Sequence, residues 1–89
     1  IDFKRIVTLK NKTYKMSLVT AIARPERLDK YLPQVVSKNY FEDHHIFTKE
    51  EITNILLRDS SASLLVTYKD FVKLTSFGIK LSSLDLDVI

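Results

Sequence analysis

Two short apolar runs, Met16–Ala23 and Ser63–Thr67, constrain the fold of this chain most strongly, because polar residues do not alternate regularly with apolar ones in either run. Runs of this kind are typical of strands that are buried on both faces. Such strands occur mainly in parallel sheets that helices cover on both sides. Since parallel strands need a helix-sized connection, we expect helices between and beside these runs.

The segment after the first run has the pattern of a helix that begins at Pro25. Proline suits the first turn of a helix, because its missing N–H needs no partner there. Leu28, Tyr31 and Leu32 follow at helical spacing. Pro33 interrupts this pattern, so the helix is predicted to kink there or to end near Leu32.

Two more helices are predicted further along the chain. Thr48 and Glu51 match a capping box, which marks the start of the first of them. Its buried stripe consists of Ile52, Ile55 and Leu56, and it is predicted to end at Asp59, Ser60 and Ser61. A shorter helix is predicted over Asp70–Leu74, where Phe71, Val72 and Leu74 are apolar.

Two further strands complete the predicted sheet, one near Tyr40–Phe41 and one over Leu84–Val88. Apolar residues alternate with aspartate in the last strand, which is the period of a half-exposed strand. Gly78, the single glycine, marks a turn before it. Strands that alternate with helices predict an α/β fold. We therefore expect residues 16–89 to form a small three-layer, Rossmann-like domain with a mainly parallel sheet.

A β-hairpin over residues 1–15 is predicted to precede this domain. Phe3–Leu9 and Thr13–Ser17 favour strands, and Asn11-Lys12 between them suits a turn. This segment carries a basic patch, and such a patch can bind nucleic acid, anionic lipid or a phosphorylated substrate. The alternative is that the lysines only protect an exposed edge strand from aggregation. The basic residues are Lys4, Arg5, Lys10, Lys12 and Lys15.

The composition excludes several kinds of site. The 89-residue chain has no cysteine, so disulfides and thiolate metal sites are excluded. The phosphate-binding pattern G-x-x-x-x-G-K-[ST] needs a pair of glycines, and the chain has one. The chain alone is therefore not expected to bind and hydrolyse a nucleotide. Because it begins at Ile1 rather than methionine, we expect a fragment or a processed product.

Polar clusters follow the predicted strands at Ala23-Arg24-Pro25, Asp43-His44-His45 and Thr67-Tyr68-Lys69-Asp70. In open α/β sheets, ligands bind outside the carboxyl ends of the strands. We therefore expect the clusters to face the same edge of the sheet. Their single cations, Arg24 and Lys69, suit a phosphate, and the alternative is a surface ion pair of each, with Glu26 and Asp70 respectively.

The Asp43-His44-His45 cluster is the strongest candidate for a catalytic role, because it combines a carboxylate with imidazoles. A carboxylate near an imidazole orients it and raises its basicity, as a general base requires. One alternative is a solvated loop whose histidine bonds to the backbone. Another is a metal site formed with Glu42, although ligands spaced this tightly rarely close a tetrahedron.

These clusters resemble motifs of the lipid A 4'-kinase (tetraacyldisaccharide 4'-kinase) family, in the same order and at matching spacing. Residues Ala21–Leu28, A-I-A-R-P-E-R-L, resemble the family's G-I-A-R-P-x-R-F stretch. Asp43–Phe47, D-H-H-I-F, resembles part of its F-x-D-H-x-x-[YF] stretch. Leu65–Leu74, L-V-T-Y-K-D-F-V-K-L, resembles its L-x-T-E-K-D-A-V-K-L stretch. Ala21 stands where the family usually has Gly, and Tyr68 where it has Glu.

The resemblance implies the C-terminal domain of a membrane-associated kinase of Gram-negative bacteria, with residues 1–15 as the interdomain linker. The family transfers the γ-phosphate of ATP, with Mg²⁺, to the 4'-hydroxyl of tetraacyldisaccharide 1-phosphate in lipid A biosynthesis. ATP and Mg²⁺ would bind mainly to an N-terminal P-loop domain that this chain lacks. The implied partners are that domain, the lipid A precursor and the anionic cytoplasmic face of the inner membrane, and no nucleic-acid partner is expected.

The resemblance also implies roles for single residues. Phosphoryl transfer depends on positioning and charge stabilisation. His44 would assist the acceptor hydroxyl or its catalytic carboxylate, and Asp43 would orient His44. Arg24 and Lys69 would bind a substrate phosphate or contact the other domain. His45 is expected to contribute much less to the reaction than His44. If the loop is exposed, substitution of either histidine is expected to change stability little.

Two other classes of function stay open from the sequence alone. One is a non-enzymatic α/β interaction module that uses the basic hairpin on an acidic partner. The other is a metal phosphoesterase built on Asp-His-His, which needs further Asp and His ligands, whereas His44 and His45 are the only histidines present.

Overall fold

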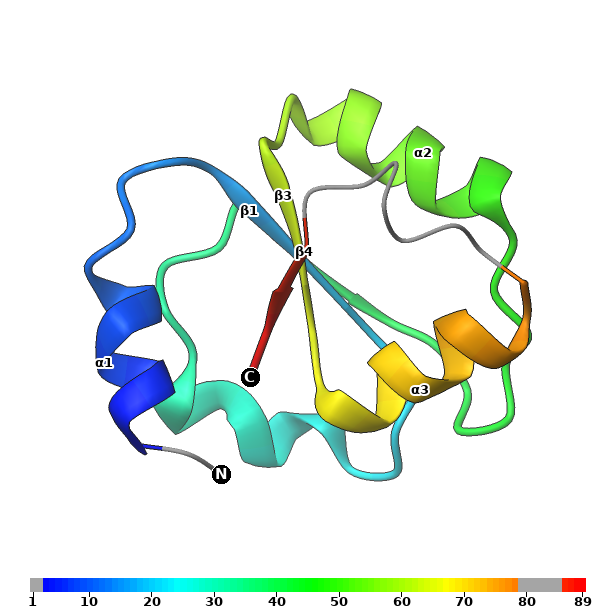
Figure 1. The fold of residues 1–89 in the computed structure, drawn as a ribbon, viewed down its shortest axis with the longest axis horizontal. Helices are drawn as coiled ribbons and strands as arrows, with labels where there is room; N and C mark the ends of the chain where they lie inside the picture. The colour runs from blue at the N-terminus through cyan, green and yellow to red at the C-terminus, as the bar shows by residue number, and fades with distance from the viewer. Residues whose placement is uncertain (1–2, 79–85) are drawn as a thin grey trace.

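The computed structural model describes residues 3–78 and 86–89, with side chains from residue 7 onward. Four strands form one sheet in the order β2-β1-β3-β4 (Figure 1). They are β1 (Met16–Thr20), β2 (Ser37–Tyr40), β3 (Ser63–Val66) and β4 (Leu86–Val88). Each strand runs parallel to its neighbours, which confirms the predicted parallel sheet. Part of the predicted last strand, Leu84 and Asp85, lies outside the described residues.

Helices cover both faces of this sheet, so the predicted three-layer arrangement is confirmed. On one face lie α2 (Lys49–Asp59) and α3 (Tyr68–Ser76), and on the other lie α1 (Phe3–Lys10) and the 3-10 helix η1 (Pro25–Tyr31) (Figure 1). Among the described helices, none has the length and apolar character needed to cross a membrane.

The predicted amino-terminal hairpin is wrong, because Phe3–Lys10 forms the α-helix α1. A hairpin leading into β1 would place a strand beside it, but β2 and β3 already pair with β1 on its two sides. The helix instead buries Leu9 against the sheet, and packing of this kind overrides the strand preference of Ile6 and Val7. The interaction-module alternative therefore loses the basic hairpin on which it depended.

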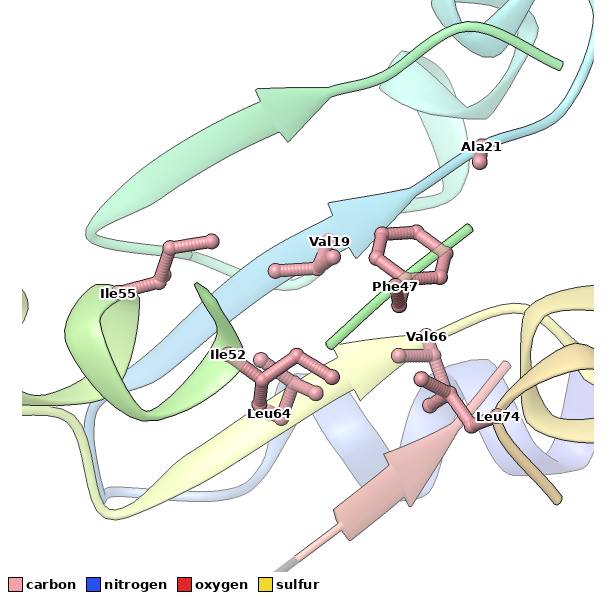
Figure 2. Close-up of a cluster of buried hydrophobic side chains, with 8 residues drawn as sticks. All are labelled: Val19, Ala21, Phe47, Ile52, Ile55, Leu64, Val66 and Leu74. Atoms are coloured by element: carbon pink, nitrogen blue, oxygen red, sulfur yellow. The ribbon is translucent and has the colours of Figure 1, made fainter. Parts of the chain in front are cut away.

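Two hydrophobic clusters fill the spaces between the layers. Figure 2 shows the larger one, which lies between the sheet and helices α2 and α3. Its buried members are Val19, Ala21, Phe47, Ile52, Ile55, Leu64, Val66 and Leu74. The smaller cluster joins α1 to the opposite face through Leu9, Met16, Leu18 and Leu65. Because β1 and β3 contribute to both clusters, these strands are buried on both faces, as their continuous apolar sequences predict.

The first predicted helix is a 3-10 helix rather than an α-helix. It starts at Pro25 and its cap residue Leu32 is extended, so the predicted end before Pro33 is confirmed. Only Leu28 within η1 is buried. Arg24, directly before η1, has φ 57° and lies in the left-handed region.

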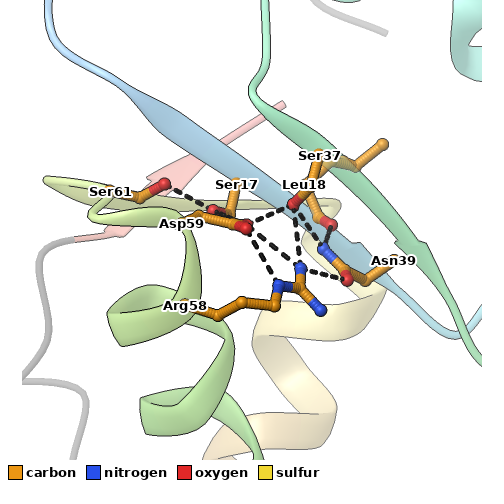
Figure 3. A network of polar contacts seen from close by, with 7 residues as sticks. All are labelled: Ser17, Leu18, Ser37, Asn39, Arg58, Asp59 and Ser61. Atoms are coloured by element: carbon orange, nitrogen blue, oxygen red, sulfur yellow. Dashed lines mark hydrogen bonds and ion pairs between the residues drawn. The ribbon is translucent and has the colours of Figure 1, made fainter.

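A polar network fixes the carboxyl-terminal end of α2 to the amino-terminal ends of β1 and β2 (Figure 3). Ser17 and Ser37, opposite each other in these strands, both donate to Oδ2 of Asp59. The Arg58 guanidinium donates to Asp59 Oδ1 at 2.9 Å and to Asn39 Oδ1 at 2.9 Å. The hydrogen bond from Arg58, followed by that from Ser37, lowers the pKa of the Asp59 carboxyl well below its usual range. This carboxylate is therefore a structural anchor at the edge opposite the polar clusters.

Candidate active site at the carboxyl edge of the sheet

The loops that follow β1, β2 and β3 meet at the carboxyl edge of the sheet, because the three strands are parallel. Two side chains of α3 connect them. Asp70 bonds to the end of β1, and Lys73 bonds to both the end of β1 and the loop after β2. The structure thus brings the three polar clusters of the sequence to one edge.

Asp70 is a fully buried carboxylate that joins α3 to β1. It accepts hydrogen bonds from Thr20 Oγ1 at 2.7 Å and from the Ala21 N–H at 2.8 Å. It also accepts from Thr67 Oγ1 at 2.6 Å and from the Thr67 N–H at 3.2 Å. Thr67 and Asp70 form a reciprocal capping box, which starts α3 directly after β3.

Lys73 lies one helical turn after Asp70 and reaches across the same edge. Its Nζ donates to the Ala21 carbonyl at 2.5 Å and to the Asp43 carbonyl at 2.7 Å. The Asp43 carboxylate is 3.7 Å away, at ion-pair distance. The backbone of Ala21 is therefore held by α3 at both its N–H and its C=O, while its Cβ packs in the core, so alanine fits where the family usually has glycine.

Asp43 and His44 form an exposed turn after β2. The Asp43 carboxylate faces Lys73 rather than His44. Within the described part of the chain, the His44 side chain makes no hydrogen bond and no ion pair. Its imidazole is therefore available to a group brought in from outside this chain.

His45 has a different environment from its neighbour. Its Nε2 lies 2.7 Å from Glu51 Oε1, its ring stacks on Phe41 at 4.6 Å, and it meets the Phe47 ring edge-on at 5.1 Å. Thr48 accepts from the Glu51 N–H as predicted, but the Glu51 carboxylate bonds to His45. His45 is therefore a packing residue of the loop. The expected small effect on stability assumed an exposed loop, and the His45 side chain is only 29% exposed.

His45→Ala is expected to lower the free energy of unfolding by about 1–2 kcal/mol, because it removes one aromatic stack and one hydrogen bond. Urea unfolding of the 89-residue chain, followed by circular dichroism, measures this loss. His44→Ala is the matched control, and since that ring is exposed and unbonded, it should change stability by less than about 0.5 kcal/mol. Equal stability of the His45 variant and the unmodified chain would contradict the packing role.

The two predicted cations, Arg24 and Lys69, are exposed at the same edge. Among the described residues, neither side chain forms a hydrogen bond or an ion pair, so the surface pairs considered from sequence are not formed. Asp70, the partner considered for Lys69, is buried and bonded to Thr20 and Thr67 instead.

Sequence reasoning placed Asp70 in a polar cluster at this edge but missed its buried bonds to Thr20 and Ala21. It did not assign Lys73 to the edge. The T-x-x-D pattern at Thr67 and Asp70 is a capping-box signal that was available in the sequence. For the metal alternative, no group of three or more His, Asp or Glu side chains in the described part of the chain is placed to hold a metal ion.

Comparison with known proteins identifies relatives of the chain. Residues 3–88 match the family model described as tetraacyldisaccharide-1-P 4'-kinase. A tetraacyldisaccharide 4'-kinase of Helicobacter pylori (strain HPAG1) is 48% identical over 86 residues, which is 96% of this chain and 28% of that protein. One of Campylobacter jejuni subsp. doylei is 40% identical over 87 residues, which is 98% of this chain and 28% of that protein. No solved structure matches the chain significantly.

Proposed function

Because the chain belongs to the tetraacyldisaccharide-1-P 4'-kinase family, we propose that it is the C-terminal domain of an ATP-dependent kinase of lipid A biosynthesis. The complete enzyme phosphorylates the 4'-hydroxyl of tetraacyldisaccharide 1-phosphate. The chain spans 28% of the length of its curated relatives, so most of such a kinase lies outside it.

The observation that carries this proposal is the carboxyl edge of the sheet, where unbonded polar side chains stand on a rigid base. Asp70 and Lys73 fix the backbone of this edge. The side chains of Arg24, His44 and Lys69 form no hydrogen bond or ion pair with the described part of the chain. Fixed backbone with uncommitted cationic or basic side chains suits a surface that completes a cleft with another domain.

In this cleft, His44 assists the acceptor hydroxyl or the carboxylate that deprotonates it. Asp43 orients His44 indirectly, because its carbonyl and carboxylate both face Lys73 and this fixes the turn that carries His44. Arg24 and Lys69 bind a substrate phosphate, since a cation at a strand end suits an anionic group.

The described residues of this chain do not form a suitable primary binding site for ATP or Mg²⁺. Mg²⁺ prefers free carboxylate oxygens, but Asp43 faces Lys73 and Asp70 is bonded to Thr20, Ala21 and Thr67. A glycine-rich phosphate loop is also absent from the sequence. We therefore assign both groups to the N-terminal P-loop domain, which supplies the phosphoryl donor and its charge neutralisation.

The segment before β1 is assigned to the connection with that domain and to the membrane. Lys10, Lys12 and Lys15 are exposed and lie at the end of α1 or in the connection from α1 to β1. Each basic residue near an anionic membrane contributes about 1 kcal/mol of attraction. The proposed location is the cytoplasmic face of the bacterial inner membrane, where the protein is peripheral or is held through its N-terminal part.

The test is transfer of radiolabelled γ-phosphate from ATP to tetraacyldisaccharide 1-phosphate by the full-length protein. The expected result is a product that carries its new phosphate at the 4'-position, and no turnover by the 89-residue chain alone. Labelled product from the rigorously purified chain alone would contradict the division of labour. Absence of product from the full-length protein would contradict the function itself.

A further inference from the structure

We propose that Lys73 is a positioning residue, which holds the Asp43–His44 turn against the carboxyl end of β1 and thereby places the His44 ring in the cleft. The inference rests on the proposed role of His44. The effect of Lys73 on the turn can be measured without an activity assay. The role of Lys73 and the role of His44 can therefore be tested separately.

The contacts of the Lys73 ammonium define this role. Its hydrogen bonds reach the Ala21 carbonyl, 52 residues away in sequence, and the Asp43 carbonyl, 30 residues away. The peptide group that carries the Asp43 carbonyl also contains the His44 nitrogen. A bond to this carbonyl therefore fixes the plane of the peptide from which the His44 side chain departs.

The other contacts of the loop leave this peptide group free. The His45 N–H donates to the Glu42 carbonyl at 2.9 Å, and the stacking of His45 on Phe41 secures the far side of the turn. Within the described part of the chain, Lys73 makes the only hydrogen bond and the only ion pair to Asp43.

Lys73 itself has a rigid base. Its side chain is 26% exposed, so surrounding atoms restrict its motion. Asp70, one helical turn earlier, binds α3 to Thr20 and Ala21. Hydrogen bonds from a charged donor are stronger than neutral ones, and this site directs a charged donor at two backbone carbonyls. A lysine needed only for packing or solubility would not require this arrangement.

The test compares Lys73→Met with Lys73→Arg in the full-length protein. Methionine keeps the length of the stem and removes the charge and the donors, whereas arginine keeps a charged donor. Lys49→Met, at an exposed position that begins α2, is the matched control. Amide hydrogen exchange of the loop over residues 41–47 reports on the turn, and steady-state kinetics with both substrates varied reports on the reaction.

Lys73→Met is expected to accelerate exchange in the loop and to lower kcat by about 10–100-fold with little change in KM, because small misplacement of a catalytic group has effects of this size. Lys73→Arg should have smaller effects on both the exchange of the loop and kcat than Lys73→Met. Combined with His44→Ala, Lys73→Met should add little further loss of kcat, because it acts through His44. The control should match the unmodified protein.

Unchanged exchange in Lys73→Met would overturn the proposal. So would a loss of kcat that is fully additive with His44→Ala, or normal kcat in Lys73→Met when His44→Ala is impaired. Faster exchange together with normal kcat in both single variants would uphold the holding of the turn and overturn the proposed role of His44.

Discussion

His44→Ala in the full-length protein is expected to lower kcat by about 10²–10⁴-fold, the usual contribution of a general base or its partner. KM should rise far less, because a group that acts mainly in the transition state leaves substrate binding largely intact. The exposed ring of His44 at the carboxyl edge makes this separation possible, since its removal breaks no hydrogen bond or ion pair within the described part of the chain.

The measurement is steady-state kinetics with ATP and the lipid substrate both varied, alongside thermal melts. His45→Ala is the comparison variant, assayed at a temperature where it stays folded, and its kcat should fall much less, because Lys73 still bonds to the Asp43 carbonyl. Normal activity of His44→Ala would return the histidine to the solvated-loop interpretation. A large fall in melting temperature with a proportional fall in activity would instead make His44 a packing residue.

Asp70→Ala is expected to lower the free energy of unfolding by about 3–5 kcal/mol. The substitution leaves the buried Thr20 hydroxyl and Ala21 N–H without their acceptor, and it removes the acceptor of Thr67. Each buried donor left unpaired costs about 1–3 kcal/mol. Domains of this size are typically stable by only about 5–15 kcal/mol, so this loss is a large share of the total.

Urea unfolding of the 89-residue chain measures this change. Asp29→Ala is the matched control, because Asp29 is exposed and pairs with Lys38 on the surface. Exposed pairs contribute about 0–1 kcal/mol, so the control should change little. A loss below about 1 kcal/mol in Asp70→Ala would show that water replaces the carboxylate and that Asp70 does not anchor the edge.

The parallel sheet could be predicted because the sequences of its central strands show directly that both of their faces are buried. Met16–Thr20 and Ser63–Val66 are buried along their whole length, and continuous apolar runs signal this directly. The segment Phe3–Lys10 gave no such signal. Its branched residues favour a strand, whereas the burial of Leu9 against distant parts of the sheet supports a helix.

The edge location of the candidate site was predictable for a related reason. Parallel strands place their following loops together, so Arg24, His44 and Lys69 could be assigned to one edge from the order of elements. Their detailed partners could not be assigned. Lys73 contacts Ala21 and Asp43 across 52 and 30 residues of sequence, and no local pattern encodes a distance of that kind.

The long separation between α3 and its partners has a consequence for synthesis on the ribosome. Asp70 lies 50 residues after Thr20, and Lys73 lies 52 residues after Ala21. At about 5–20 residues per second, several seconds pass between the appearance of these groups. A nascent chain that has not reached Asp70 already contains Arg24 and His44, but it lacks the α3 side chains that bond to Ala21 and Asp43 in the loops that carry them. The carboxyl edge of the sheet is therefore completed late, only after α3 has been made.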